Sequence, residues 1–332
     1  MQFSEAILAR RRIAIAFTLA VVLLTLLRWD SSTHVVSLKL ISPQLKESPR
    51  MGLVDSATTA QRSRSDKPTL DIVVSHYKED LKKTATMLHE LLNLPKFRQL
   101  EVEIHFYTKN KDMDLDLIRR TINTTRVTLL PNLGREGGTF IDHIILNFDR
   151  LARHSMFIQA AMHEYDHAKN HIGDYFGVDT GVLSLGTYES CNCVDCTDPW
   201  DAARKFPRLE ELYAALNGQF CPKSVVLTYL GQFITSATRI RSRGLKAYEY
   251  LKKVLEADES HFIHADPKQD IFQDDVTNPY FGHTLERSWM ILFGCSEKRL
   301  VEKCGSWPGL KTARKPLGSN DDCQCLDDIR VP

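Results

Sequence analysis

The sequence lacks the short motifs that mark several large enzyme classes. It contains no G-x-S-x-G, no P-loop and no G-x-G-x-x-G, which disfavours hydrolases of that type, P-loop nucleotidases and dinucleotide-binding enzymes. It also lacks an excess of charge of one sign, because 43 Lys and Arg residues against 42 Asp and Glu residues leave a formal net charge of +1. This balance gives no reason to expect nucleic acid as a partner. With 43% hydrophobic and 26% charged residues over 332 positions, the chain is typical of one large folded domain or two small ones.

One apolar run stands near the amino terminus. Three arginines precede the run from Ile13 to Leu27, and Arg28 and Trp29 close it. No small-x-small cleavage site follows, and Trp29 suits a membrane interface, so the run favours a signal anchor over residues 13–29 rather than a cleaved signal peptide. The positive cluster predicts a cytoplasmic tail of residues 1–12 and places the rest of the chain in the lumen of the endoplasmic reticulum or Golgi.

The cysteines agree with a lumenal location. All eight follow residue 190, and their even number predicts disulfide bonds, although the sequence does not give their pairing. The cluster CNCVDC leaves zinc open as an alternative, but a matching second C-x-x-C pair is missing. Asn123 begins an N-glycosylation sequon, Asn123-Thr124-Thr125, which is compatible with the same location.

Hydrophobic periodicity divides the remaining chain into three parts. Residues 30–68 are rich in polar residues and show no sustained periodicity, which predicts a flexible stem. Residues 69–300 alternate strand and helix patterns, and residues 301–332 form an irregular, cysteine-bearing tail. The expected strands are 69–77, 100–108, 127–131, 155–162 and 224–236; the expected helices are 78–94, 114–122, 135–151, 207–219, 244–258 and 281–295. This alternation predicts an α/β layered fold with a mostly parallel sheet, whose ligands bind at the carboxyl ends of its strands.

The stretch HEYDH has the spacing of a zinc-protease motif. His163 and His167 would lie one helical turn apart with Glu164 beside them, and His171 or Glu189 would supply a third ligand. No H-x-x-G-x-x-H extension follows, and the charged Asp166 is unusual within such a motif. Two other interpretations stay open: a polar surface turn, or a loop in which Glu164, Asp166 and His167 hold a divalent ion that bridges two phosphates.

Five blocks together resemble a known family. They are IVVSHYKEDL, LPNLGREGGTFIDHII, MFIQAAMHEYDH, LGQFITSATRIRSRGLKAYEYL and LERSWMILFG. In order and spacing they are similar to a fungal family of single-pass membrane proteins catalogued as a domain of unknown function, of the DUF3431 type, over residues 70 to 295. The N-x-G-R-E block is the most specific part. In that comparison Asp166 and His167 occupy family positions, whereas His163 and Glu164 are particular to this chain.

The layout of the family is in turn similar to A-type glycosyltransferases. This resemblance implies a three-layer α/β sandwich that transfers a sugar from a nucleotide donor to an unknown acceptor, with Mn²⁺ or Mg²⁺ as a candidate cofactor. Donor-binding candidates are His76, Tyr77, Asn132, Arg135 and Glu136, and Gln232 is a candidate for the acceptor site. Glu286 and Asp166 are the catalytic candidates, with Glu286 as the general base.

Three blocks depart from the family pattern and leave other functions open. Lys78 replaces an Asn, residues 159–162 read QAAM in place of Q-G-x-P, and residues 236–240 read SATRI in place of S-R-E-R-I. A zinc-dependent hydrolase that uses HEYDH and a catalytically silent, membrane-tethered binding domain are therefore the alternatives. Arg135 and Glu136 also have a structural interpretation, as an ion pair that closes a turn.

Overall fold

The computed structural model describes residues 69–199, 201, 205–264, 274–306 and 318–327. All of them belong to one of the two compact units of the chain, Ser63–Pro332. The predicted tail, anchor and stem, residues 1–12, 13–29 and 30–68, lie outside the described residues. Among the helices that the structure describes, none has the length and apolarity that a membrane span requires.

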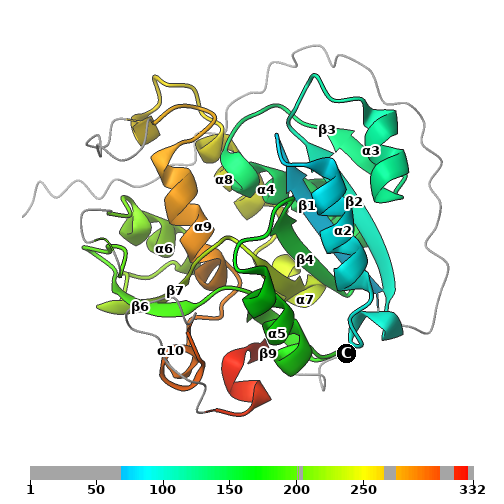
Figure 1. Cartoon of the computed structure of the whole chain (residues 1–332). Helices are drawn as coiled ribbons and strands as arrows, with labels where there is room; N and C mark the ends of the chain where they lie inside the picture. The colour runs from blue at the N-terminus through cyan, green and yellow to red at the C-terminus, as the bar shows by residue number, and fades with distance from the viewer. Residues whose placement is uncertain (1–68, 200, 202–204, 265–273, 307–317, 328–332) are drawn as a thin grey trace, which may run out of the picture. The chain divides into compact units, whose positions relative to one another are not determined.

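A seven-stranded sheet forms the centre, in the order β3-β2-β1-β4-β8-β5-β9 (Figure 1). Its strands are β1 (Thr69–His76), β2 (Glu101–Thr108), β3 (Val127–Leu129), β4 (His154–Gln159), β5 (Thr180–Ser184), β8 (Phe233–Ser236) and β9 (Cys325–Leu326). The first four in this order pair in parallel, whereas β8 is antiparallel to both β4 and β5, and β9 is antiparallel to β5. The α/β prediction is confirmed, with a sheet that is mixed on its β8 side.

Helices cover both faces of this sheet, so the fold has three layers. Side chains alternate along β1: Leu70, Ile72 and Val74 pack with one group of helices, and Val73 packs with the other. The first face is covered by α2 (Leu81–Leu92), α3 (Leu115–Ile122) and α5 (Tyr165–Tyr175). The second is covered by α4 (Arg135–Asn147), α7 (Ala237–Arg241), α8 (Leu245–Leu255) and α9 (Tyr280–Leu292). Figure 1 shows α2 crossing in front of β1 and β2.

Local signals explain where these elements begin and end. Helix α2 begins after Asp80, whose carboxylate accepts hydrogen bonds from the backbone N–H groups of Lys82 and Lys83. The strand expected over residues 224–236 is two strands, because Leu230 and Gly231 have left-handed backbones (φ 78° and 59°) and turn the chain. The first of them, β7 (Ser224–Thr228), pairs with β6 (Tyr188–Asn192) in a separate two-stranded sheet that contacts α9.

The remaining elements are short. They are α6 (Leu209–Asn217), α10 (Arg299–Lys303) and the 3-10 helices η1 (Phe97–Gln99), η2 (Phe148–Arg150), η3 (Phe262–His264) and η4 (Asn320–Cys323). The segment expected as an irregular tail, residues 301–332, thus contributes the end of α10, η4 and an edge strand of the main sheet, β9.

Four disulfide bonds confirm the prediction from the cysteine pattern. Cys191–Cys196 joins β6 to the loop that follows it, and Cys193–Cys221 joins that loop to the segment before β7. Cys295–Cys325 and Cys304–Cys323 fasten the carboxyl-terminal segment to the end of α9 and to α10. The cysteines of CNCVDC are therefore all in disulfides and offer no thiolate to a zinc ion.

Candidate active site

A hollow of about 320 Å³ lies at the carboxyl edge of the sheet. The chain leaves β1 toward β2 on one side, while β4 lies on the other side of β1, so this edge carries a topological switch point between β1 and β4. Ligands of open α/β sheets bind at such points. The hollow is lined by Ser75, His76, Tyr77, Glu79, Lys109, Asn132, Arg135, Glu136, Gln159, His163, Thr277 and Asn278.

A second hollow of about 550 Å³ adjoins the first. Tyr77, Lys109 and Asn132 line both, so the two hollows form one cleft along the ends of β1, β2 and β3. The second hollow adds two further cations, Lys78 and Lys111, and an apolar floor of Leu129 and Leu130. The cleft therefore combines positive charge with apolar surface, which suits a ligand with an anionic group and a flat ring.

Arg135 stands at the first turn of α4, in the turn that the N-x-G-R-E block forms. Both Gly134 and Arg135 have left-handed backbones (φ 62° and 51°), and a Cβ on Gly134 would lie only 2.8 Å from Leu255 Cγ. Their backbone N–H groups donate to the carbonyls of Val276 and Thr277 at 3.0 and 3.3 Å. These two N–H groups are therefore used within the protein, and the guanidinium is the group that Arg135 offers to the cleft.

The Arg135 guanidinium joins two carboxylates. Its Nη1 lies 3.3 Å from Glu286 Oε2, and its Nε lies 3.5 Å from Glu136 Oε2. It also contacts the ring of His283. The ion pair with Glu136 that the sequence allowed is thus present, and it extends to α9. With about a quarter of its side chain exposed, Arg135 remains accessible from the cleft.

Glu286 lies directly behind this lining. Burial raises the pKa of its carboxyl above the ordinary value, Arg287 opposes that effect, and the negative charge of Glu136 adds to it. The turn between β7 and β8 touches both carboxylates, since a Cβ on Gly231 would lie 3.1 Å from Glu286 Cγ and 3.5 Å from Glu136 Oε1. Two carboxylates and one guanidinium therefore meet at one wall of the cleft.

Lys109 is a further cleft residue, one that the sequence interpretation did not single out. It directly follows β2, and its ammonium donates to the carbonyls of Leu133 and Arg135. Burial lowers the pKa of Lys109 to about 8, although Glu136 and Glu256 act in the opposite direction. Because Lys109 directly follows a parallel strand, the sequence could have predicted its position at this edge of the sheet.

The two candidates at the end of β1 have different environments. The His76 ring is buried and bonded on both sides, to Thr108 Oγ1 at 2.9 Å and to the Glu79 carbonyl at 3.1 Å. It therefore shapes the floor of the cleft. Tyr77 is 38% exposed and lines both hollows, so its ring offers a stacking surface. Asn132 is half-buried and also lines both hollows.

Gln232 holds the loop after β4. Its side-chain amide accepts from the His163 backbone N–H at 2.9 Å and donates to the His163 carbonyl at 3.0 Å. With 2% of its surface exposed, Gln232 positions the loop that carries His163 to the cleft.

The rest of HEYDH points elsewhere. Helix α5 begins at Tyr165, so His163 precedes the helix that carries His167, and Glu164 has a left-handed backbone. Asp166 is exposed and pairs with Lys169 at 2.8 Å, while Lys169 also reaches Glu90 on α2. The structure therefore brings His163 to the cleft, but neither Asp166 nor His167 lines it.

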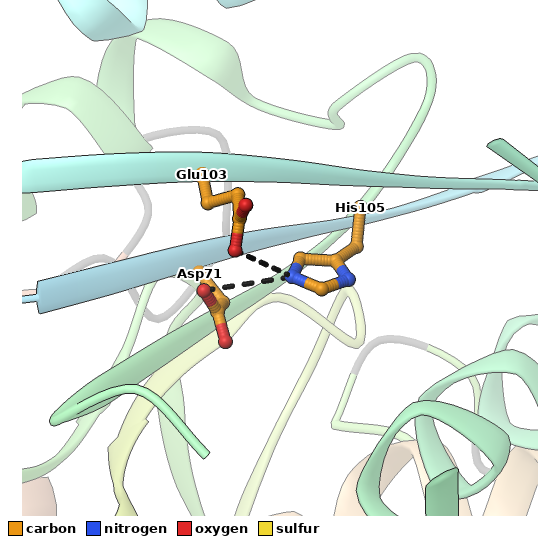
Figure 2. A group of neighbouring side chains, drawn as sticks. All are labelled: Asp71, Glu103 and His105. Carbon is orange, nitrogen blue, oxygen red and sulfur yellow. Dashed lines mark ion pairs between the residues drawn. The ribbon is translucent and has the colours of Figure 1, made fainter. Parts of the chain in front are cut away.

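The other zinc-motif candidates lie away from the cleft, and His167 Nε2 is buried without a hydrogen-bond partner among the residues that the structure describes. The His167 ring lies 4.1 Å from that of His171, between centroids, and His171 Nδ1 hydrogen-bonds the Ser184 carbonyl at 3.0 Å. Glu189 lies on β6, where it accepts from Thr187 Oγ1. Within the described residues, the three ligand groups that converge closely enough to share an ion are those of Asp71, Glu103 and His105, nearer the amino ends of the strands (Figure 2). The cleft thus supplies no comparable three-residue set in the described part of the chain for the Mn²⁺ or Mg²⁺ that the resemblance implies.

The predicted glycosylation site lies on the surface. Asn123 is exposed and ends α3 in a left-handed conformation with φ 59°. Its neighbour Thr124 donates to the Ile104 carbonyl at 2.7 Å, which ties the loop to β2. Asn123 is accessible to a modifying enzyme.

Comparison with known families identifies the family of this chain. Residues 72–306 match the family model described as "Protein of unknown function (DUF3431)". The match covers more than half of the chain, so the protein belongs to this family. Among curated proteins, no match was found.

Proposed function

We propose that the protein is a glycosyltransferase that moves a sugar from a nucleotide donor to an acceptor hydroxyl. The observation that supports this best is the meeting of Arg135, Lys109 and Glu286 at the switch point of a parallel sheet. Cations at this edge suit a diphosphate, and a buried carboxylate next to them suits proton transfer.

In this proposal the donor occupies both hollows. The Tyr77 ring stacks on the base, and the apolar floor of Leu129 lies beneath the second hollow. Arg135 and Lys109 neutralise the diphosphate, the group on which negative charge develops as the sugar leaves. Asn132, which lines both hollows, hydrogen-bonds the donor between these two parts.

Glu286 acts as the general base. When Arg135 turns toward the diphosphate, its pairing with Glu286 weakens, and the carboxylate accepts the proton of the acceptor hydroxyl. The acceptor oxygen bonds to the anomeric carbon, and the bond between that carbon and the diphosphate oxygen breaks with its electron pair on the diphosphate. A raised pKa makes Glu286 a more effective proton acceptor near neutral pH.

Thermal shift tests the binding step. The unit Ser63–Pro332 is melted with nucleoside diphosphates and nucleotide sugars, with and without Mn²⁺ or Zn²⁺. One donor is expected to raise Tm in the parent and in Arg119→Ala, whose exposed side chain pairs with Asp116 on α3, but not in Arg135→Ala. A shift from Zn²⁺ alone that His163→Ala cancels would instead support the hydrolase that uses HEYDH.

Donor hydrolysis tests the chemical step without knowledge of the acceptor. Release of nucleoside diphosphate from the nucleotide sugar is measured for Glu286→Gln and for Glu136→Gln. Loss of a general base is expected to lower the rate by about 10²–10⁴-fold in Glu286→Gln, with donor affinity retained. Equal loss in both variants would show that the two carboxylates act only by holding Arg135.

We also propose that residues 13–29 anchor the protein in the membrane with its folded unit in the lumen of the endoplasmic reticulum or Golgi. The exposed Asn123 sequon provides the test. A glycan that endoglycosidase removes, and that Asn123→Gln abolishes, is expected for a lumenal chain. An unglycosylated chain that fractionates with cytosolic proteins would contradict this orientation.

A further inference from the structure

A buried imidazole lies between two carboxylates on the face of the sheet that α4 covers. Asp71 is on β1, and Glu103 and His105 are on β2. His105 Nε2 lies 3.6 Å from Asp71 Oδ1 and 3.6 Å from Glu103 Oε2. Figure 2 shows the three side chains pointing toward one another, with the imidazole nitrogen between the two carboxylates. This group lies nearer the amino ends of the strands, apart from the cleft.

The distances in this group are too long for hydrogen bonds. An N–H···O bond spans about 2.7–3.2 Å, and His105 Nε2 is buried without a hydrogen-bond partner in the structure. His105 itself is 7% exposed. A buried polar atom without a partner costs free energy, so something is expected to satisfy it.

The same distances suit ligands of one metal ion. Zinc lies about 2.0–2.2 Å from nitrogen and oxygen ligands in tetrahedral sites, which separates neighbouring ligand atoms by about 3.3–3.6 Å. The ligand atoms of Asp71, Glu103 and His105 all lie within 4.8 Å of one another. The observed separations from Nε2 therefore fit an ion at the centre of the group.

The strand register gives an independent reason for a cation here. Asp71 and Glu103 are direct partners across β1 and β2, and their side chains share one face. Like charges directly opposite on neighbouring strands destabilise a sheet. Arg126 binds the other Glu103 oxygen, Oε1, at 2.5 Å, so Oε2 remains directed at the imidazole. An ion bound between the carboxylates would turn their repulsion into a link between the two strands.

We propose that Asp71, Glu103 and His105 bind zinc or a similar divalent transition-metal ion. One imidazole and two carboxylates form a mixed nitrogen and oxygen set, which zinc accepts and which Ca²⁺ and Mg²⁺, with their preference for oxygen ligands, do not favour. Glu103 is about one-third exposed, which gives the ion a route from solvent and leaves room for a water ligand. The ion clamps β1 to β2 beneath α4.

Metal analysis of the purified protein tests this site. After dialysis against Zn²⁺ and then metal-free buffer, about one zinc per chain is expected in the parent and in His154→Gln. His154 is also a buried histidine, and it hydrogen-bonds the Thr180 carbonyl, so it controls for the loss of a buried ring. Zinc is expected to fall below about a tenth per chain in His105→Gln.

Two further measurements keep the proposal falsifiable if His105→Gln folds poorly. Glu103→Gln changes a partly exposed side chain and is expected to weaken zinc binding at least tenfold in a competition with a chromophoric chelator. Co²⁺ in place of zinc is expected to give visible absorption bands in the parent and none in Glu103→Gln. Retained zinc in both variants would place the ion elsewhere, and a parent that binds no zinc would overturn the proposal.

The site is separable from the proposed transferase. Arg135→Ala is expected to keep its zinc while losing donor binding, and Glu103→Gln is expected to keep donor binding while losing zinc. If one of the two proposals fails its test, the other can therefore still hold.

Discussion

Arg135 and Glu286 form an ion pair between the first turn of α4 and the middle of α9, with Nη1 3.3 Å from Oε2. Both side chains are mostly buried, so the pair links the two helices at the wall of the cleft. Removing the guanidinium leaves Glu286 with Arg287 at 3.5 Å and the ring of His283 at 3.9 Å. The negative charge of the buried Glu286 carboxylate is then only partly compensated.

Arg135→Met is expected to lower the free energy of unfolding by about 1–3 kcal/mol at pH 7, because it leaves a buried carboxylate without one of its partners. Urea denaturation measures this value. The double variant Arg135→Met/Glu286→Gln is expected to recover at least half of the loss, since the carboxylate charge is gone too. If both variants were equally destabilised, the pair would not be coupled.

Lys109 gives anion binding a pH dependence. Its cation is present below a pKa of about 8 and is lost as the pH rises through that value, so diphosphate binding is expected to weaken several-fold between pH 7 and pH 9. Calorimetric titration with a nucleoside diphosphate measures the effect. Lys109→Arg stays charged over this range, so its affinity for the diphosphate is expected to change little with pH. If the affinity of this variant still fell with pH as in the parent, another group would cause the effect.

His154 is expected to make the fold sensitive to acid. Burial lowers its pKa to about 4, against the opposing hydrogen bond to the Thr180 carbonyl. A histidine that is neutral in the fold binds its proton more readily when unfolded, so stability is full above about pH 6.5 and is lost as the pH falls toward 4. The slope reaches about 1.4 kcal/mol per pH unit for one such group.

Urea denaturation at several pH values in this range measures that slope. His154→Gln keeps a side chain able to hydrogen-bond. It is expected to reduce the slope by up to about 1.4 kcal/mol per pH unit, the contribution of one bound proton. His89→Gln, an exposed histidine on α2, is expected to leave it unchanged. An identical slope in His154→Gln would mean that other buried histidines, such as His143, account for the acid sensitivity.

Gly231 and Gly218 form a matched pair for testing the cleft wall. Both have left-handed backbones, with φ 59° and 64°. A Cβ on Gly218 would meet open space, whereas one on Gly231 would lie 3.1 Å from Glu286 Cγ. Gly218→Ala is therefore expected to cost about 1 kcal/mol from backbone strain alone.

Gly231→Ala is expected to cost more stability than Gly218→Ala and also to reduce donor hydrolysis, because the added methyl group displaces Glu286. Chemical denaturation and nucleoside diphosphate release are measured on both variants. Equal activity in the two would show that the position of Glu286 does not control the reaction.

Much of the fold was predictable because both hydrophobic periods are clear in the first half of the domain. Strands β1 and β2 and helices α2 and α4 follow their patterns closely. Helix α5 was missed because it is polar on most of its surface and buries only Ala168, His171 and Ile172. Strand β5 is short and wholly buried, so it shows no alternation, and periodicity alone does not identify such a segment.

The cleft was predictable in part, because parallel strands bring the residues that follow them to one edge. Tyr77, Asn132 and Arg135 were found in this way, and the same rule places Lys109 there. The group around His105 was hidden for a different reason. Alternation along β2 separates two faces, but the sequence does not show that α4 covers the polar face too, so buried ionisable residues resemble surface ones.

The place of β8 in the sheet has a consequence for synthesis on the ribosome. β8 lies between β4 and β5, although it follows both in the chain. Until Phe233–Ser236 have been made, the outer edge of β4 has no strand to pair with, a delay of several seconds at roughly 5–20 residues per second. During that time the nascent chain carries an open strand edge of the kind that pairs with other chains.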